Sequence, residues 1–119
     1  MPVRSLSSSV LRWPNRDEVE AAVRAWYAEI RRDLAAQVVR AGYFGSYARG
    51  DWGVGSDVDI ILIVASSDLP FERRSVRFDT LRLPVPADLL VYTLRVWEAH
   101  RELPAGRRVA AEVVWLSPD

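Results

Sequence analysis

The feature that most constrains the fold is the segment DVDIILIV, residues 57–64. Apart from Asp57 and Asp59, every side chain in it is aliphatic, and most are β-branched. A strand of this composition is typical of a position that is covered on both faces, inside a sheet with helices packed against it. We therefore expect an α/β or α+β domain in which helices flank a small mixed sheet.

The rest of the chain alternates helical and extended patterns around this segment. A helix is predicted from Asp17 to about Ala36, with Asn15 and Glu18 in the positions of a capping box. Its apolar face consists of Val19, Val23, Trp26, Tyr27, Ile30 and Leu34. Further strands are predicted at 38–44, 87–92 and 109–116, a helical turn at 46–49, and helices at 71–81 and 94–103. We expect Pro104 and Gly106 to end the last helix, residues 1–14 to be a loose lead-in, and residues 15–119 to form a single domain.

Missing residue types exclude several classes of site. The 16 basic residues are all arginine, so neither a P-loop nor a Schiff-base enzyme is compatible with the chain, because both need a lysine. There is no cysteine, which rules out disulfides and thiolate zinc sites. The formal net charge is zero, and this argues against a chain that grips nucleic acid unaided. No apolar run reaches the ~20 residues of a membrane span, so we expect a soluble, cytoplasmic protein.

A glycine-serine turn follows the strand predicted at 38–44. Gly45 permits a ligand to approach the backbone closely, and free N–H groups at a helix start favour an anion such as phosphate. The chain then passes through a glycine-rich loop and enters the central strand with Asp57-Val58-Asp59. Gly45 and Ser46 are therefore candidates for a phosphate-binding turn.

Asp57 and Asp59 should lie on one face of the central strand, because side chains two apart point to the same side. Asp88 opens the strand predicted at 87–92 and reaches the same place if the two strands are neighbours. Carboxylates crowded together call for a cation, and oxygen ligands suit Mg²⁺. The set fits two-metal phosphoryl transfer, in which Asp57 and Asp59 bridge both ions. Asp88 then holds the activating ion and accepts a proton. A solvated surface pair of aspartates and an ordinary glycine loop remain the alternatives at this stage.

Together these residues resemble a known signature. GSYARGD, a gap of ten residues from Ser46 to Asp57, and then SDVDIILIV resemble the DNA polymerase beta-type nucleotidyltransferases. Asp88, within ADLLVY, resembles the third carboxylate of that superfamily. The chain is most similar to its minimal members, the MNT or MntA-like antitoxins.

The resemblance implies a polymerase-beta-type nucleotidyltransferase core, with the triphosphate of ATP bound by Gly45 and Ser46. It implies magnesium at Asp57, Asp59 and Asp88, and a phosphate contact for Arg49. It also implies a toxin–antitoxin pair, in which AMP is transferred from ATP to a hydroxyl of a small helical HEPN toxin. The rival interpretations are an antitoxin that silences its partner by contact alone and a small-molecule nucleotidyltransferase. The sequence leaves open whether the chain forms a homo-oligomer or a hetero-oligomer.

Three other features receive simpler interpretations. We expect His100, the only histidine, to be a surface residue. Arg73 and Arg77 are expected on the solvated face of a helix. Trp52, in the glycine loop, is expected either to pack in the core or to contact a ligand or partner.

Overall fold

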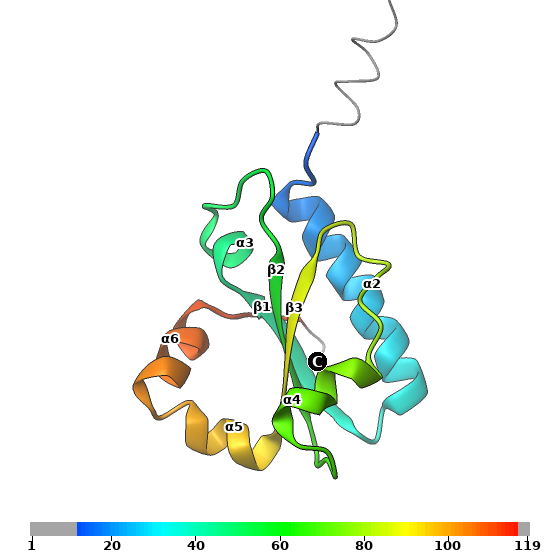
Figure 1. Cartoon of the computed structure of the whole chain (residues 1–119), viewed down its shortest axis with the longest axis vertical. Helices are drawn as coiled ribbons and strands as arrows, with labels where there is room; N and C mark the ends of the chain where they lie inside the picture. Colours follow the sequence, from blue (N-terminus) through cyan, green and yellow to red (C-terminus); the bar gives the residue numbers. More distant parts are fainter. Residues whose placement is uncertain (1–11, 117–119) are drawn as a thin grey trace, which may run out of the picture.

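The computed structural model describes residues 12–116, which form one four-stranded sheet with helices on both faces (Figure 1). Along the chain the elements are α2 (Arg16–Leu34), β1 (Val38–Phe44), α3 (Ser46–Arg49), β2 (Val58–Val64), α4 (Phe71–Arg74), the 3₁₀ turn η1 (Ser75–Arg77), β3 (Ala87–Thr93), α5 (Leu94–His100), α6 (Pro104–Glu112) and β4 (Val114–Leu116). The predicted lead-in lies mostly outside the described residues, as does the end of the predicted domain at 117–119.

The strands are ordered β3-β2-β1-β4. The central strand β2 pairs with β1 in antiparallel fashion and with β3 in parallel fashion, while β4 runs antiparallel to β1. The small mixed sheet flanked by helices that the sequence predicts is therefore confirmed. The parallel β2–β3 pair has a direct consequence for the site, because parallel neighbours in register present their side chains on the same face.

Helix α2 begins as its sequence predicts. The Asn15 side chain accepts a hydrogen bond from the Glu18 backbone N–H, and the Glu18 carboxylate accepts one from the Asn15 N–H, each at 2.9 Å. This capping box satisfies two donors that would otherwise lack partners at the helix start. The helix ends at Leu34, two residues before the predicted boundary.

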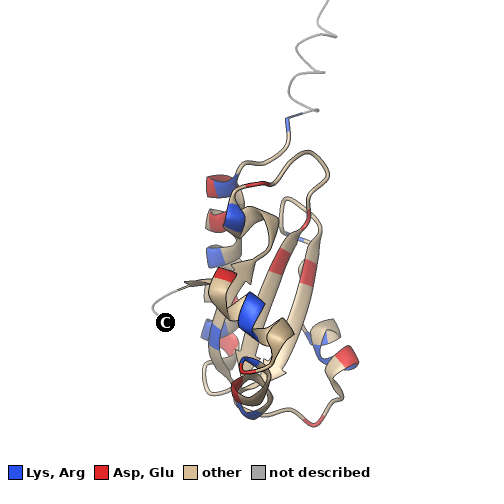
Figure 2. Cartoon of the chain, turned by 90° about the vertical axis from the view of Figure 1, so that its left-hand side faces the viewer, with Lys and Arg blue, Asp and Glu red and all other residues tan. Residues whose placement is uncertain are grey.

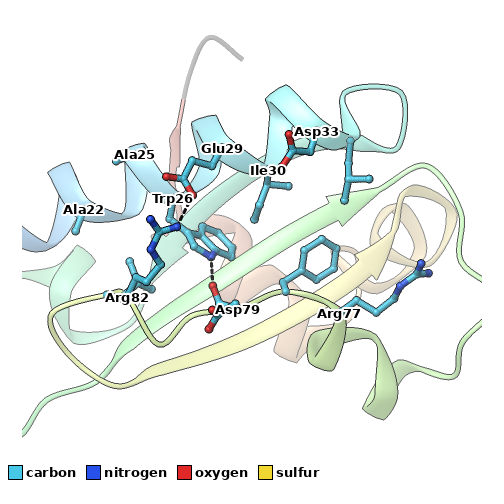
Figure 3. A pocket seen from close by; sticks show the side chains of 12 residues that line it. Ala22, Ala25, Trp26, Glu29, Ile30, Asp33, Arg77, Asp79 and Arg82 are labelled. Carbon is cyan, nitrogen blue, oxygen red and sulfur yellow. Dashed lines mark hydrogen bonds and ion pairs between the residues drawn. The ribbon is translucent and has the colours of Figure 1, made fainter.

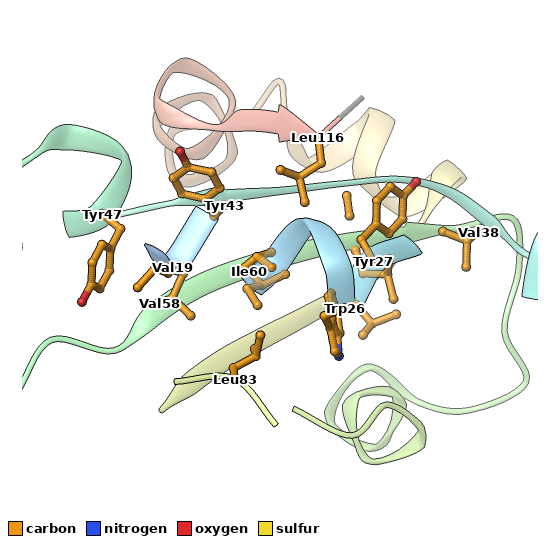
Figure 4. Packing of buried hydrophobic residues seen from close by; sticks show 14 of the residues in the cluster. Val19, Trp26, Tyr27, Val38, Tyr43, Tyr47, Val58, Ile60, Leu83 and Leu116 are labelled. Atoms are coloured by element: carbon orange, nitrogen blue, oxygen red, sulfur yellow. The ribbon is translucent and has the colours of Figure 1, made fainter. Parts of the chain in front are cut away.

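One face of the sheet is covered by α2 and by the segment that leads into β3. Val58, Ile60, Leu62 and Val64 alternate along β2 toward this side, where they meet the buried stripe of α2 (Figure 4). The opposite face carries Ile61 and Ile63, which pack with Trp97 of α5. Figure 1 shows α2 on one side of the sheet and α5 and α6 on the other. Asp59 shares the side-chain direction of Ile61 and Ile63, so it belongs to the α5–α6 face.

Two segments differ from the prediction. The helix expected at 71–81 is only α4 and η1, and the chain beyond Arg77 runs as loop along α2, where the Trp26 indole N–H donates to the Asp79 carbonyl at 2.8 Å.

The strand expected at 109–116 is confirmed only over 114–116, because α6 continues to Glu112. Pro104 starts this helix instead of ending the previous one, since proline is favoured in the first turn, where no N–H is needed. No helix within residues 12–116 is long and apolar enough to span a membrane.

Candidate functional site

The site is built around Gly45, between the end of β1 and the start of α3. Gly45 has φ +77°, which favours glycine, and a side chain there would run into the Asp59 carboxylate. The turn therefore needs glycine for two reasons, a left-handed conformation and the close approach of Asp59. Because α3 is only four residues long, binding of an anion would depend on individual N–H groups here and little on a helix dipole.

The carboxylates come together through strand register. Asp59 and Asp88 are direct partners in the parallel β2–β3 ladder. Their side chains consequently point to the same face, and Figure 2 shows acidic positions side by side on two neighbouring strands. Asp57 comes two residues before Asp59, just outside β2, and is exposed. The structure thus brings all three predicted aspartates to one end of one face of the sheet.

Burial and like charge raise the pKa of Asp59 to about 6. Burial is the larger cause, followed by the negative charges of Asp57 and Asp88. Arg49 acts in the opposite direction, which places its positive charge within reach of the cluster. A carboxylate crowded by others in this way is a position where a bound cation would be strongly stabilised.

The donor set suits a hard divalent cation, since it consists of carboxylate oxygens with neither sulfur nor imidazole. Within residues 12–116, however, no three acidic or histidine side chains are already grouped as a metal-binding set. Asp57 and Asp88 are nevertheless close enough to Asp59 for their negative charges to raise its pKa.

A fourth carboxylate, which the sequence did not point out, enters the site from α6. Oε1 of Glu112 accepts a hydrogen bond from the Gly45 backbone N–H at 3.2 Å. Both of its oxygens accept from Nη1 of Arg49, at 3.2 and 3.3 Å, and Arg49 Nε donates to Asp51 at 3.1 Å. Glu112 was not predicted, because its segment was expected to be a strand and because no local sequence pattern signals a contact between residues this far apart.

Two aromatic predictions can be placed as well. Trp52 stacks on Tyr47, with ring centroids 5.4 Å apart and an interplanar angle of 8°, and it packs against the α2-side core. His100 differs from its prediction, since it is half-buried and stacks on Tyr92 at 5.2 Å between centroids. The contacts of both residues are with aromatic neighbours, as in packing.

Arg73 and Arg77 are exposed, but no continuous helix carries them, because α4 ends at Arg74. Arg74, between them, donates to the backbone carbonyls of Leu69 and Val91 at 2.9 and 3.2 Å. This arginine therefore ties the segment to β3.

A groove of about 400 Å³ lies elsewhere, between α2 and residues 77–83 (Figure 3). Its walls include Trp26, Ile30 and Phe78, and the ion pair between Arg82 and Glu29 closes one side at 3.0 Å. It shares no lining residue with the carboxylate cluster, so the chemistry predicted from the sequence does not belong to this groove.

Comparisons with known proteins found one matching family model and similar solved structures. The family model described as "Nucleotidyltransferase domain" matches residues 25–108, which is more than half of the chain. Among solved structures, a protein from Sulfolobus solfataricus proposed to be a nucleotidyltransferase is similar, with a TM-score of 0.62 and 19% sequence identity. The similarity covers 84% of this chain and 80% of that one. No curated protein matches. At this identity the structural likeness supports the fold alone, a polymerase-beta-type nucleotidyltransferase core. The residues matched by the family model include Gly45 and the three aspartates but not Glu112. The chain therefore belongs to the nucleotidyltransferase domain family.

Proposed function

We propose that this nucleotidyltransferase-family chain transfers AMP from ATP to a hydroxyl of a partner protein, with magnesium, and that the partner is a helical HEPN toxin which the transfer silences. The donor, the metal and the acceptor are taken from the resemblance to the minimal members of the superfamily. A cytoplasmic location accompanies that role.

The observation that carries the proposal is the register of the parallel β2–β3 pair. It sets Asp59 beside Asp88, with Asp57 two residues earlier and the Gly45 turn directly against Asp59. A phosphate-binding turn next to three carboxylates is the combination that nucleotidyl transfer requires.

Gly45, Ser46 and Arg49 hold the triphosphate, so that its α-phosphorus faces the acceptor. The acceptor oxygen attacks that phosphorus, the bond to the pyrophosphate oxygen breaks, and pyrophosphate leaves. Asp88 accepts the proton of the attacking hydroxyl. Magnesium, in two ions held by Asp57, Asp59 and Asp88, would neutralise the charge on the phosphates.

Label transfer from α-³²P-ATP tests the proposal, with purified wild type and Asp57→Asn added to lysate of the native host. We expect one labelled protein band that requires both Mg²⁺ and Asp57, and its mass identifies the acceptor. Asp57 is exposed, so its replacement should leave the fold intact, as circular dichroism can verify. A band of equal intensity with Asp57→Asn would contradict the assignment. Binding of Mg²⁺-ATP with no labelled protein at all would instead favour silencing by contact alone or a small-molecule acceptor.

A further inference from the structure

Glu112 occupies the groups that the proposed function assigns to the triphosphate. Its carboxylate accepts hydrogen bonds from the Gly45 N–H at 3.2 Å and from Arg49 Nη1 at 3.2 and 3.3 Å. The Glu112 side chain is only 20% exposed, whereas Arg49 is 42% exposed. The contact joins the end of α6 to the β1–α3 turn, so it is part of the packing of the site.

These donors are limited in number. A backbone N–H has one hydrogen and serves one good acceptor, so Gly45 cannot bind Glu112 and a phosphate oxygen equally well. Arg49 has more donors, but its Nε is already bound to Asp51. A carboxylate at this point also repels an incoming phosphate. The chain thus presents its own anion where a nucleotide would place one.

We propose that Glu112 is an additional residue of the nucleotide site, a built-in competitor that a triphosphate must displace from Gly45 and Arg49. The inference rests on the proposed function, from which it takes the triphosphate contacts of these two residues. Arg108, one turn earlier on the same helix and 79% exposed, already has its Nε 3.8 Å from Glu112 Oε2, so a cationic neighbour for the Glu112 carboxylate is available on its own helix. Glu112 therefore lowers triphosphate affinity and makes binding depend on a rearrangement at the end of α6.

Calorimetric titration with ATP in Mg²⁺ tests this with wild type, Glu112→Gln and Glu29→Gln. Glu29 is the matched control, because it too pairs with one arginine, at 3.0 Å, and lies in the distant groove. We expect Glu112→Gln to bind ATP about five-fold more tightly or better, since a neutral amide competes less well than a charged acceptor. Glu29→Gln should bind as wild type does. Unchanged or weaker binding by a folded Glu112→Gln would overturn the inference.

A second measurement uses the unaltered chain, in case Glu112→Gln does not fold. The amide resonance of Gly45 and the side-chain carboxyl carbon of Glu112 should both shift when ATP saturates the protein. Carboxyl and amide signals that stay in place at saturation would show that the contact persists and would overturn the inference. If wild type transfers AMP but neither result is as expected, the inference alone fails. If wild type binds neither ATP nor inorganic triphosphate, the proposed function fails with it.

Discussion

Asp59 is the carboxylate of the site whose pKa is raised by its surroundings. Its pKa is raised from 3.8 to about 6, chiefly by burial and then by Asp57 and Asp88. The folded state therefore binds a proton more readily than the unfolded state. This stabilisation is fully present below 3.8 and is lost as the pH rises through 6.

As the pH falls from about 6 toward 4, the stability of the metal-free wild type should therefore rise relative to that of Asp59→Asn. The asparagine variant removes the titrating group, so it should lack this component and should be the more stable of the two at neutral pH. Thermal melts in chelator across this range measure the difference. Asp33→Asn, an exposed site on α2, is the control. Parallel curves for wild type and Asp59→Asn would contradict the argument.

Replacement of Gly45 by alanine can be compared with the same replacement at Gly50. Both have positive φ, +77° and +89°, so alanine is strained at either position. Only at Gly45 would the added methyl also collide with the Asp59 carboxylate, since nothing lies within 4 Å of the corresponding position at Gly50. We expect Gly45→Ala to cost at least about 1 kcal/mol more in urea unfolding than Gly50→Ala. Equal losses would mean that the approach of Asp59 is easily relaxed.

Helix α6 is the element on which the site depends and which the sequence did not predict. Its Gly106 is buried, and a methyl there would strike the backbone carbonyl of His100 at the end of α5. Gly106→Ala should therefore push α6 away from α5 and cost about 2 kcal/mol or more. Gly53→Ala adds the same methyl in open space and should be nearly neutral. Urea unfolding of the two variants measures this, and a Gly106→Ala protein as stable as wild type would show that α6 packs loosely.

The order of the earlier elements could be predicted from local pattern. The α2 stripe, the β1 run and the aliphatic β2 segment each have one clear period or composition, and all three were found within two residues of their expected bounds. The segment 104–116 has neither one clear period nor a composition typical of one kind of element. An apolar run such as VAAEVVWL is compatible with either a strand or a short helix, and packing against α5 decides between them. The helix predicted at 71–81 was wrong for a related reason, because its apolar residues do not form one buried face: Phe78 packs in the α2-side core, while Val76 and Leu81 are exposed.

Part of the site could also be predicted from local pattern. Asp57 and Asp59 are tied to each other by the two-residue period of a strand, and Asp88 follows once β2 and β3 are neighbours. Glu112 lies 67 residues from Gly45, and only the tertiary fold joins them. No local pattern carries information about such a contact.

At the scale of the whole molecule, folding and ligand binding should be linked. The carboxylate cluster is repulsive without a cation, and the Gly45 turn presents its donors only in the folded state. A ligand that binds the native state alone stabilises it by about 2.7 kcal/mol at a hundred-fold excess over Kd. For a domain of about 100 residues this corresponds to a rise in melting temperature of the order of 10 °C.

Mg²⁺ with ATP should therefore raise the melting temperature of wild type by several degrees or more, and chelator should reverse the effect. Asp57→Asn should lose most of the gain, because it removes a carboxylate without touching the core. Sodium chloride at equal ionic strength controls for screening, which would also relieve repulsion among the carboxylates but without any need for a divalent ion. An equal rise with sodium, or with Asp57→Asn, would mean that the cluster responds to ionic strength alone and that the three aspartates do not form a specific cation site.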